Sequence, residues 1–400
     1  MVHPRAGTGK LVHLMTRHGI KETLLTGALS AFALGAWTQN GTVPPASPPS
    51  LSPVILAENP DVVERGFDVD SEAVRQMVNN CLLKLTSASD IGTAWTRLGI
   101  TPQDVVGIKI TTMGVPTHRP IVQAICDGLQ AAGVPVSHII VWDKMADDMI
   151  RAGYPPRASD DLHVGLAAIF PGTGYDPSVV YKNEMLGTLI WGDYDFIRNN
   201  TNDDLAEAAR EAVKNKAFGG DEANLDPFDM GADAPQTSNR SYYARLVTQI
   251  CTKIINVPVL CDNSYIGIDG CLGSLALASV DNNRRFQGDP TYGDPAICQI
   301  LDRNFMRHKV VVHILDALVS QYAGGPRFDP QFTKSIGAIY VSRDPVAIDA
   351  LVLPRLERWR RSDREGRIDP IGHTASHVHS AASYNLGTDD PNRIQLVRLP

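Results

Sequence analysis

Short apolar runs alternate along this chain with segments of helical periodicity. Residues 105–110 and 139–142 have the composition of buried strands, and the segment 120–132 between them has helical spacing. Two strands joined through a helix form a βαβ unit, in which the strands are parallel. Further strands are predicted at 254–260, 309–315, 336–341 and 394–399, and further helices at 72–85, 241–249, 295–305 and 345–361. This pattern predicts an α/β fold with a mostly parallel or mixed twisted sheet and helices on both faces.

Polar residues follow directly on these strands. Lys109 lies near the end of the first strand, and Asp143, Asp262, Asp316 and Asp344 each follow a later one. In an open α/β sheet, ligands bind outside the carboxyl ends of the strands. We therefore expect these side chains to lie near one edge of the sheet and to bind a small-molecule ligand there.

Two adjacent glycines, Gly324 and Gly325, follow the strand that leads to Asp316. Glycines allow tight turns and a close approach of the backbone to a ligand. Successive backbone N–H groups in such a turn can also bind an anion. We include both glycines among the ligand-binding candidates, with an ordinary loop as the alternative.

Three carboxylates could instead hold a divalent cation, because hard cations prefer carboxylate oxygens. Asp316, Asp344 and Asp349 are the candidates. Asp344 precedes Pro345, so it could equally be the N-cap of a helix. Asp349 lies in an apolar stretch of that helix and needs a partner. A buried cap or an ion pair with Lys109 would also satisfy it.

Three histidines, His373, His377 and His379, lie close together near the end of the chain. A helix would place His373 and His377 on one face, as in some metal sites. No glutamate completes a zinc-protease motif, so surface or capping histidines are the simpler interpretation.

Composition limits the partners and cofactors. The 400 residues carry a net charge of −7, and no basic stripe is present, so nucleic acid is not expected as a partner. None of the six cysteines forms a C-x-x-C pair, so no iron–sulfur cluster is expected. Cys81 and Cys126 fit core positions, whereas a disulfide among Cys251, Cys261, Cys271 and Cys298 is allowed in an exported protein. The sequence does not indicate an oligomeric state.

The N-terminal residues differ from the rest. Residues 1–40 have basic residues followed by an apolar stretch at 24–37, too short to span a bilayer comfortably. The string at 16–21 resembles a twin-arginine export signal in which His18 replaces the second arginine. We expect a periplasmic or secreted protein without a stable membrane span after signal removal. The alternative is an amphipathic helix that stays on the protein.

The expected organisation follows from these patterns. A Pro/Ser-rich linker occupies residues 41–53, and residues 54–400 form a single α/β domain. Within it, residues 155–239 are rich in Gly, Pro, Asp and Asn, and we expect a long irregular insertion with one helix at 203–215.

The segments from about residue 95 onward resemble the family called domain of unknown function 362, in its exported bacterial branch. The resemblance rests on the order and spacing of several strings: VGIK at 106–109, INVPVL at 255–260, ILDAL at 314–318, QYAGGP at 321–326, DPVAID at 344–349 and LGTDDP at 386–391. It implies a fold and a site rather than an activity.

This chain departs from the family pattern at several polar positions. Thr111 replaces an asparagine, residues 261–263 read CDN where a lysine and a histidine are usual, and Gly273 and Ser274 replace a Lys-Asn pair. Such losses would weaken a site built to hold an anion or move a proton. Two hypotheses follow: an exported, enzyme-like protein of unknown reaction, or a non-catalytic paralogue that acts as a binding or interaction protein. No catalytic residue is assigned.

Overall fold

The computed structural model describes residues 51–64, 67–156, 162–199, 236–363 and 368–400. The expected signal segment at 1–40, most of the linker and the helix predicted at 203–215 lie outside these residues. One compact unit runs from Pro49 to Pro400. Among the described residues, no helix combines the length and apolar character needed to cross a membrane.

A ten-stranded mixed sheet forms the centre of this unit, as the alternating pattern predicts. Its main path runs in the order β12-β1-β11-β10-β7-β2-β3-β4, and β8 and β9 attach beside β10. The pairs from β10 through β4 are parallel, whereas β11 is antiparallel to both β10 and β1. The strands are β1 (Ser52–Glu58), β2 (Val106–Ile110), β3 (Ile139–Met145), β4 (Gly165–Phe170), β7 (Lys253–Val257), β8 (Val259–Asn263), β9 (Gly267–Ile268), β10 (Val310–Gln321), β11 (Thr333–Ser342) and β12 (Ile394–Arg398).

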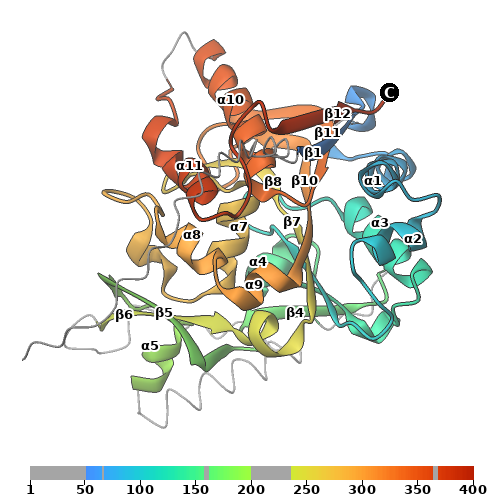
Figure 1. Ribbon diagram of the computed structural model, residues 1–400. Coiled ribbons are helices and arrows are strands. Elements are labelled where there is room, and N and C mark those ends of the chain that lie inside the picture. The colour runs from blue at the N-terminus through green and yellow to red at the C-terminus, as the bar shows by residue number, and fades with distance from the viewer. Residues whose placement is uncertain (1–50, 65–66, 157–161, 200–235, 364–367) are drawn as a thin grey trace, which may run out of the picture. The chain divides into compact units, whose positions relative to one another are not determined.

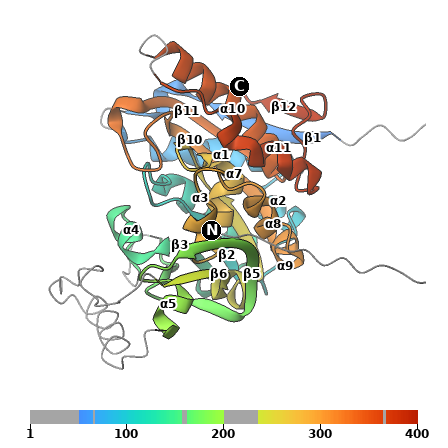
Figure 2. The same cartoon turned by 90° about the vertical axis from the view of Figure 1, so that its left-hand side faces the viewer.

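Helices cover both faces of the sheet (Figure 1). One apolar core lies between the strands and α1 (Ser71–Thr86), α2 (Ile91–Arg97), α3 (Arg119–Ala131) and α4 (Ala146–Arg151). The other lies between the opposite face and α7 (Gly270–Ser279), α8 (Ala296–Leu301), α9 (Asn304–Lys309), α10 (Pro345–Ser362) and α11 (Ser376–Ser383). Figure 2 shows α10 and α11 beside β1 and β12.

The helix α1 illustrates how local sequence sets an element. Asp70 caps it, because its carboxylate accepts hydrogen bonds from the N–H groups of Glu72 and Ala73. The buried positions Val74, Met77, Val78, Cys81 and Leu82 recur at helical spacing, so one face of the helix packs on the sheet.

Four predicted strands differ from the structure. The strand β3 continues past residue 142 to Met145, so Asp143 lies inside it rather than after it, and Asp262 likewise lies inside β8. The predicted strand 254–260 is two strands, β7 and β8, because Pro258 has no N–H with which to continue the ladder. The strand β10 continues past residue 315, so Asp316 lies inside it rather than after it. Finally, β11 runs antiparallel to β10, so Asp344 follows a strand that ends at the amino ends of its parallel neighbours.

The region 155–239 is more regular than expected. Its described residues include β4 at the edge of the main sheet, the helix α5 (Tyr194–Asn199), and β5 (Tyr175–Thr188), which pairs with β6 (Thr237–Ala244) in a separate two-stranded sheet. The helix expected at 241–249 is wrong in its first half, because residues to Ala244 belong to β6. A π-helical turn, Leu246–Ile250, follows.

All six cysteines are free and buried. Cys81 and Cys126 lie in the core, as their spacing predicts. The disulfide that the sequence allowed among the other four does not form.

Candidate functional site

A row of polar side chains crosses the middle of the sheet. The strands β2, β7, β10 and β11 place Lys109, Asn256, His313 and Ser342 opposite one another in register. All four residues are buried. The Asn256 amide donates to the Cys271 carbonyl at 2.9 Å and lies 3.1 Å from His313 Nδ1. The carboxyl ends of the parallel strands lie on one side of this row, and their amino ends lie on the other.

A compact polar cluster lies at the carboxyl ends of β2 and β3. The Lys109 ammonium group donates to Ser274 Oγ at 2.6 Å and lies 3.6 Å from Asp143 Oδ1. Thr111 Oγ1 is 3.2 Å from the same serine hydroxyl. Thr112 donates its N–H at 3.0 Å and its hydroxyl at 2.7 Å to Asp143 Oδ2. We call these five buried residues the carboxyl-edge cluster.

The topology explains why Lys109 and Asp143 meet. The strands β2 and β3 are parallel neighbours, and Lys109 lies opposite Trp142. The next residue, Asp143, lies inside β3 opposite Ala168 of β4, beside the end of β2. The sequence predicts that both side chains lie near the carboxyl edge of the sheet, because the two strands of a βαβ unit are parallel and usually neighbours.

Asp269 lies next to the carboxyl-edge cluster, immediately before α7. Its carboxylate accepts a hydrogen bond from the Asn263 amide at 3.0 Å. Burial raises the pKa of Asp269 to about 6, although the Asn263 hydrogen bond and the positive charge of Lys109 oppose this rise. This carboxyl group therefore exchanges its proton near neutral pH, as general acids and bases do.

Asp262 belongs to a second polar group. It forms an ion pair with Arg360 at 2.8 Å and accepts the Gly325 N–H at 3.0 and 3.1 Å. Burial raises the pKa of Asp262 to about 6, with the Arg360 charge acting in the opposite direction. A Cβ on Gly325 would lie 2.0 Å from the Asp262 carbonyl oxygen. The backbone N–H group expected to bind a ligand anion thus binds a carboxylate of this chain. Its neighbour Gly324 has a φ of +81°, the backbone conformation that favours glycine.

Asp316 is fully buried inside β10, and its carboxylate binds His118 in the loop before α3. Its Oδ2 accepts the backbone N–H of His118 at 2.8 Å and contacts His118 Nδ1 at 2.8 Å. Its Oδ1 accepts the Leu318 N–H at 3.1 Å. Burial disfavours a positive charge on His118, but the Asp316 carboxylate outweighs burial and raises the pKa of His118.

Asp344 and Asp349 act as caps. Asp344 lies beyond Ser342, on the amino side of the polar row, and accepts the Ala347 N–H at 2.8 Å as the N-cap of α10. Asp349 accepts the N–H groups of Cys271 and Leu272, at 2.7 and 3.0 Å, in the first turn of α7. Burial raises the pKa of Asp349 to about 7. The capping alternatives that the sequence left open are therefore what the structure contains.

The carboxylates expected to share a cation have separate partners. Asp316 binds the His118 loop, Asp344 caps α10 and Asp349 caps α7. In the part of the chain that the structure describes, no three His, Cys, Asp or Glu side chains could hold a metal ion together. The structure therefore does not assemble the predicted cation site.

The three histidines near the C-terminus also have different surroundings. His379 is exposed and pairs with Asp389, and His373 packs edge-on against Tyr292. His377 is buried, which differs from the surface or capping role expected for it, and burial lowers its pKa to about 4.

Four residues of these polar groups were missed in the sequence. They are Ser274, Asp269, His118 and Arg360, and each is held by a partner from a distant part of the chain or lies before a Gly-rich helix. Their partners are 165 residues away for Ser274, 198 for His118 and 98 for Arg360. A usable signal existed only at Asp269, whose position directly before an apolar helix is typical of a residue at a buried helix end.

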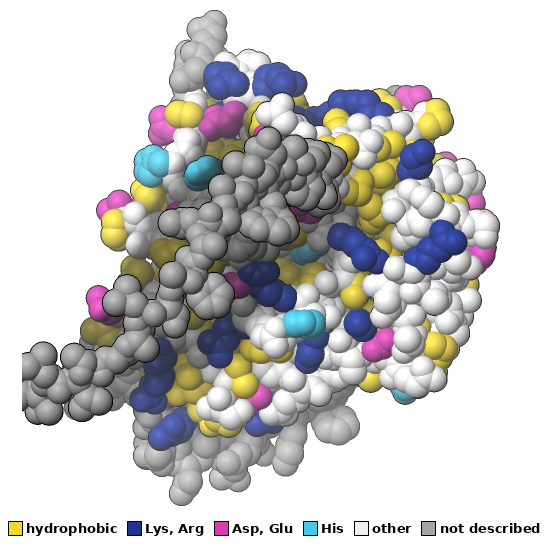
Figure 3. All heavy atoms as spheres, in the orientation of Figure 1, with side chains coloured by type: hydrophobic (Ala, Val, Ile, Leu, Met, Phe, Trp, Pro, Cys, Tyr) yellow, Lys and Arg dark blue, Asp and Glu magenta, His cyan; other side chains and the backbone are white. Residues whose placement is uncertain are grey.

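Charged side chains are mixed on the surface. On the face shown in Figure 3, lysine and arginine side chains are spread among acidic, apolar and uncharged ones.

Comparison with known proteins does not identify the chain. No protein-family model matches it, and no curated protein does. A crystal structure of a Thermotoga maritima protein, a structural genomics target, is similar at 10% sequence identity with a TM-score of 0.32. That similarity covers 79% of this chain and 59% of the other protein. A similarity at this level identifies neither a family nor an activity.

Proposed function

We propose that this protein is enzyme-like and binds a small molecule at the carboxyl-edge cluster, with Lys109 as the main contact. The observation that carries this proposal is the state of the Lys109 ammonium group. Its side chain is 3% exposed and forms an ion pair with Asp143 at 3.6 Å, but among the described residues its one hydrogen-bond acceptor is a neutral hydroxyl, Ser274 Oγ. A buried ammonium group normally has its remaining donors satisfied. A carboxylate or carbonyl oxygen of a ligand would satisfy them.

Asp269 supports the enzyme-like part of the proposal. The pKa of the Asp269 carboxyl group is about 6, so this group can donate or accept a proton. It interacts electrostatically with Lys109, whose ammonium group would bind an oxygen of the ligand. Together they supply the elements of proton transfer at a carbon or oxygen next to a carbonyl group. The reaction and its substrate are not named by these residues.

A second candidate function is that of a non-catalytic binding protein. It is favoured by one observation: Asp316 and Asp349 are fully buried and hydrogen-bonded within the fold rather than directed at a ligand. This candidate predicts ligand binding that does not change when Asp269 is replaced by asparagine and no turnover of any bound molecule.

We also propose membership of the family called domain of unknown function 362 and export from the cytoplasm. Both rest on the sequence patterns at residues 95–400 and 1–40. Cell fractionation tests export: mature chain in the periplasm or medium, cleaved near residue 40, is the expected result. Uncleaved chain confined to the cytosol would refute it.

Thermal melting with small carboxylates tests the ligand proposal. Acetate, pyruvate and citrate are the probes, because each presents an oxygen that Lys109 could bind. We expect at least one to raise the melting temperature of the wild type in a saturable way. The shift should vanish in Lys109→Met, because the ammonium group is gone, and weaken in Ser274→Ala.

The matched control is Lys182→Met, which removes a lysine from an exposed position on β5. It should keep the full response. An equal response in Lys109→Met and the wild type, or no response to any probe, contradicts the proposal. Adding Mg²⁺ and Mn²⁺ to the same experiment tests the cation hypothesis, with Asp316→Asn as the variant that should lose any effect.

A further inference from the structure

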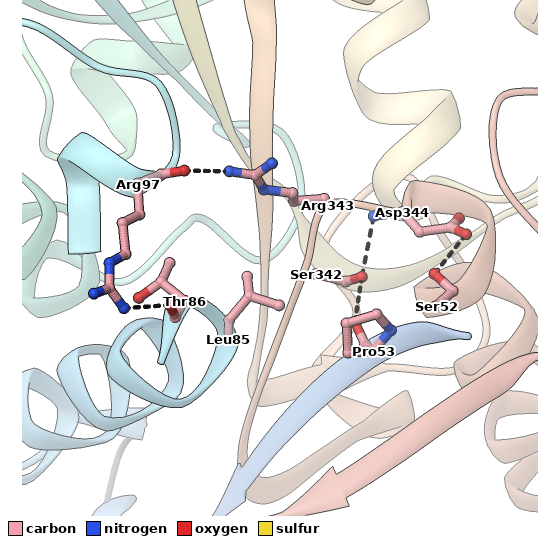
Figure 4. A pocket seen from close by; sticks show the side chains of 8 residues that line it. All are labelled: Ser52, Pro53, Leu85, Thr86, Arg97, Ser342, Arg343 and Asp344. Carbon is pink, nitrogen blue, oxygen red and sulfur yellow. Dashed lines mark hydrogen bonds between the residues drawn. The ribbon is translucent and has the colours of Figure 1, made fainter. Parts of the chain in front are cut away.

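A cavity of about 330 Å³ lies at the opposite edge of the sheet from the carboxyl-edge cluster (Figure 4). Elements that are far apart in the sequence form its wall: the start of β1, the ends of α1 and α2, and the turn from β11 into α10. The residues that line it are Ser52, Pro53, Leu85, Thr86, Arg97, Ser342, Arg343 and Asp344.

Two arginines of this wall are held in place by backbone carbonyl groups. Arg97 donates from one nitrogen to the carbonyls of Thr86 and Ser87, at 3.1 and 2.5 Å. Arg343 donates to the carbonyl of Arg97 at 2.7 Å. Each contact lies at the C-terminal end of a helix, where a positive charge is favoured. Within the described residues, these three carbonyls are the hydrogen-bond acceptors of both guanidinium groups.

Most donors of the two guanidinium groups therefore have no acceptor in the described part of the chain. A guanidinium group carries several N–H donors in a fixed plane, and each arginine uses one nitrogen. Because the backbone contacts already restrict the side chains, less conformational freedom is lost when a ligand binds.

The carboxylate oxygens near the cavity are already hydrogen-bonded. The Asp344 carboxylate accepts hydrogen bonds from Ser52 Oγ at 2.7 Å, from the Ala347 N–H at 2.8 Å and from the Thr388 N–H at 3.0 Å. Asp90, which interacts electrostatically with Arg97, accepts two hydrogen bonds from Thr93. The wall thus offers two positive charges with free donors and one negative charge whose oxygens are occupied.

We propose that this cavity binds a small oxyanion between Arg97 and Arg343, namely the phosphate group of a small phosphorylated molecule. Arginine forks match the geometry of phosphate oxygens, and such charge-assisted hydrogen bonds are strong. The cavity is larger than a phosphate group, and Pro53 and Leu85 add apolar surface for the organic part. This site is independent of the function proposed for the carboxyl-edge cluster.

Isothermal titration of the full chain with inorganic phosphate tests the proposal, against sodium chloride at equal ionic strength. We expect saturable binding of phosphate and tighter binding of glycerol 3-phosphate, a phosphate monoester. Arg97→Gln and Arg343→Gln should each raise the dissociation constant at least about tenfold, because each loses a charged hydrogen-bond donor. Binding of phosphate alone, with no gain for the monoester, would indicate free phosphate as the ligand.

The control is Arg327→Gln, which removes the same charge at an exposed position in the loop after β10, at the carboxyl edge of the sheet. It should leave both dissociation constants unchanged. If a glutamine variant does not fold, Arg97→Lys and Arg343→Lys replace it; they keep the charge but lose the fork, and both should bind more weakly. Three results would overturn the proposal: no saturable binding in the wild type, equal weakening in Arg327→Gln, or loss of binding in Lys109→Met while both cavity arginine variants still bind.

Discussion

A buried carboxylate can serve the fold instead of a ligand, and Asp349, inside α10, is the clearest case. The residue before α7, Asp269, makes no side-chain capping hydrogen bond. Instead, the carboxylate oxygens of Asp349, in α10, accept the N–H groups of Cys271 and Leu272. Gly270 makes this possible, because a Cβ there would lie 2.5 Å from the Asp349 carboxylate. A helix end whose cap comes from a distant helix leaves no local pattern in the sequence.

Replacing Asp349 tests this role. Asp349→Ala leaves two buried N–H groups of α7 without an acceptor, so we expect the free energy of unfolding to fall by about 2–4 kcal/mol. Asp90→Ala removes an exposed cap from α2 and should lower it by clearly less. Urea denaturation measures both values. Equal losses would show that Asp349 is not a buried cap.

The pH dependence of stability gives a second test at the same residue. Burial raises the pKa of Asp349 to about 7, above the value of about 3.9 in an unfolded chain. The folded protein then keeps a proton that the unfolded chain releases, so the contribution of this group to stability falls as the pH rises through that window. The wild type should therefore lose stability more steeply than Asp349→Asn between about pH 4 and 7. Parallel curves for the two proteins would contradict this.

At the scale of elements, the direction of one strand decides which carboxylates share an edge. No helix lies between β10 and β11; the connection, residues 322–332, contains only the short turn Pro330–Phe332. Parallel strands need a longer crossover, usually helical, so an antiparallel pair is what this connection allows. Asp344 consequently lies at the opposite edge from Asp143. The sequence indicates this antiparallel pairing, because it predicts no helix between the two strands.

The close contact between β8 and the loop after β10 gives a prediction at this scale. Gly325→Ala would place a Cβ 2.0 Å from the Asp262 carbonyl oxygen, so the loop after β10 must move. We expect a loss of about 2–3 kcal/mol in unfolding free energy, since crowding of this kind requires backbone shifts.

Gly99→Ala is the matched control for that variant. Gly99, unlike Gly325, has a positive φ, but a Cβ there meets no atom within 4 Å. Gly99→Ala should lower the free energy of unfolding by only about 1 kcal/mol, because it causes backbone strain alone. If both variants lose the same stability in urea, the contact between Gly325 and Asp262 does not constrain the loops.

Over the whole molecule, local patterns predicted the fold class but only part of the site. Alternating strands and helices predict a sheet covered on both faces, and the ten-stranded sheet confirms this. The meeting of Lys109 and Asp143 follows from neighbouring parallel strands. Ser274 and Arg360 could not be predicted in the same way. Their positions depend on how α7 and α10 pack against strands formed by distant segments.

The cysteines give a prediction for the molecule as a whole. All six are buried, and burial raises the pKa of Cys81, Cys251 and Cys298 to about 12. Thiolates are the reactive form, so the native protein should react slowly with a thiol reagent such as dithionitrobenzoate. Six equivalents should react after unfolding in guanidinium chloride without a reductant. Fewer than six would reveal a disulfide.

The strand β1 lies between β11 and β12, so the earliest described strand is held by the two latest ones. During translation, β1 therefore has neither of its pairing partners until β11 has left the ribosome. Until then its apolar residues Val54, Ile55 and Leu56 are open to chaperones. The order of the strands thus delays completion of the sheet until β12 has been made.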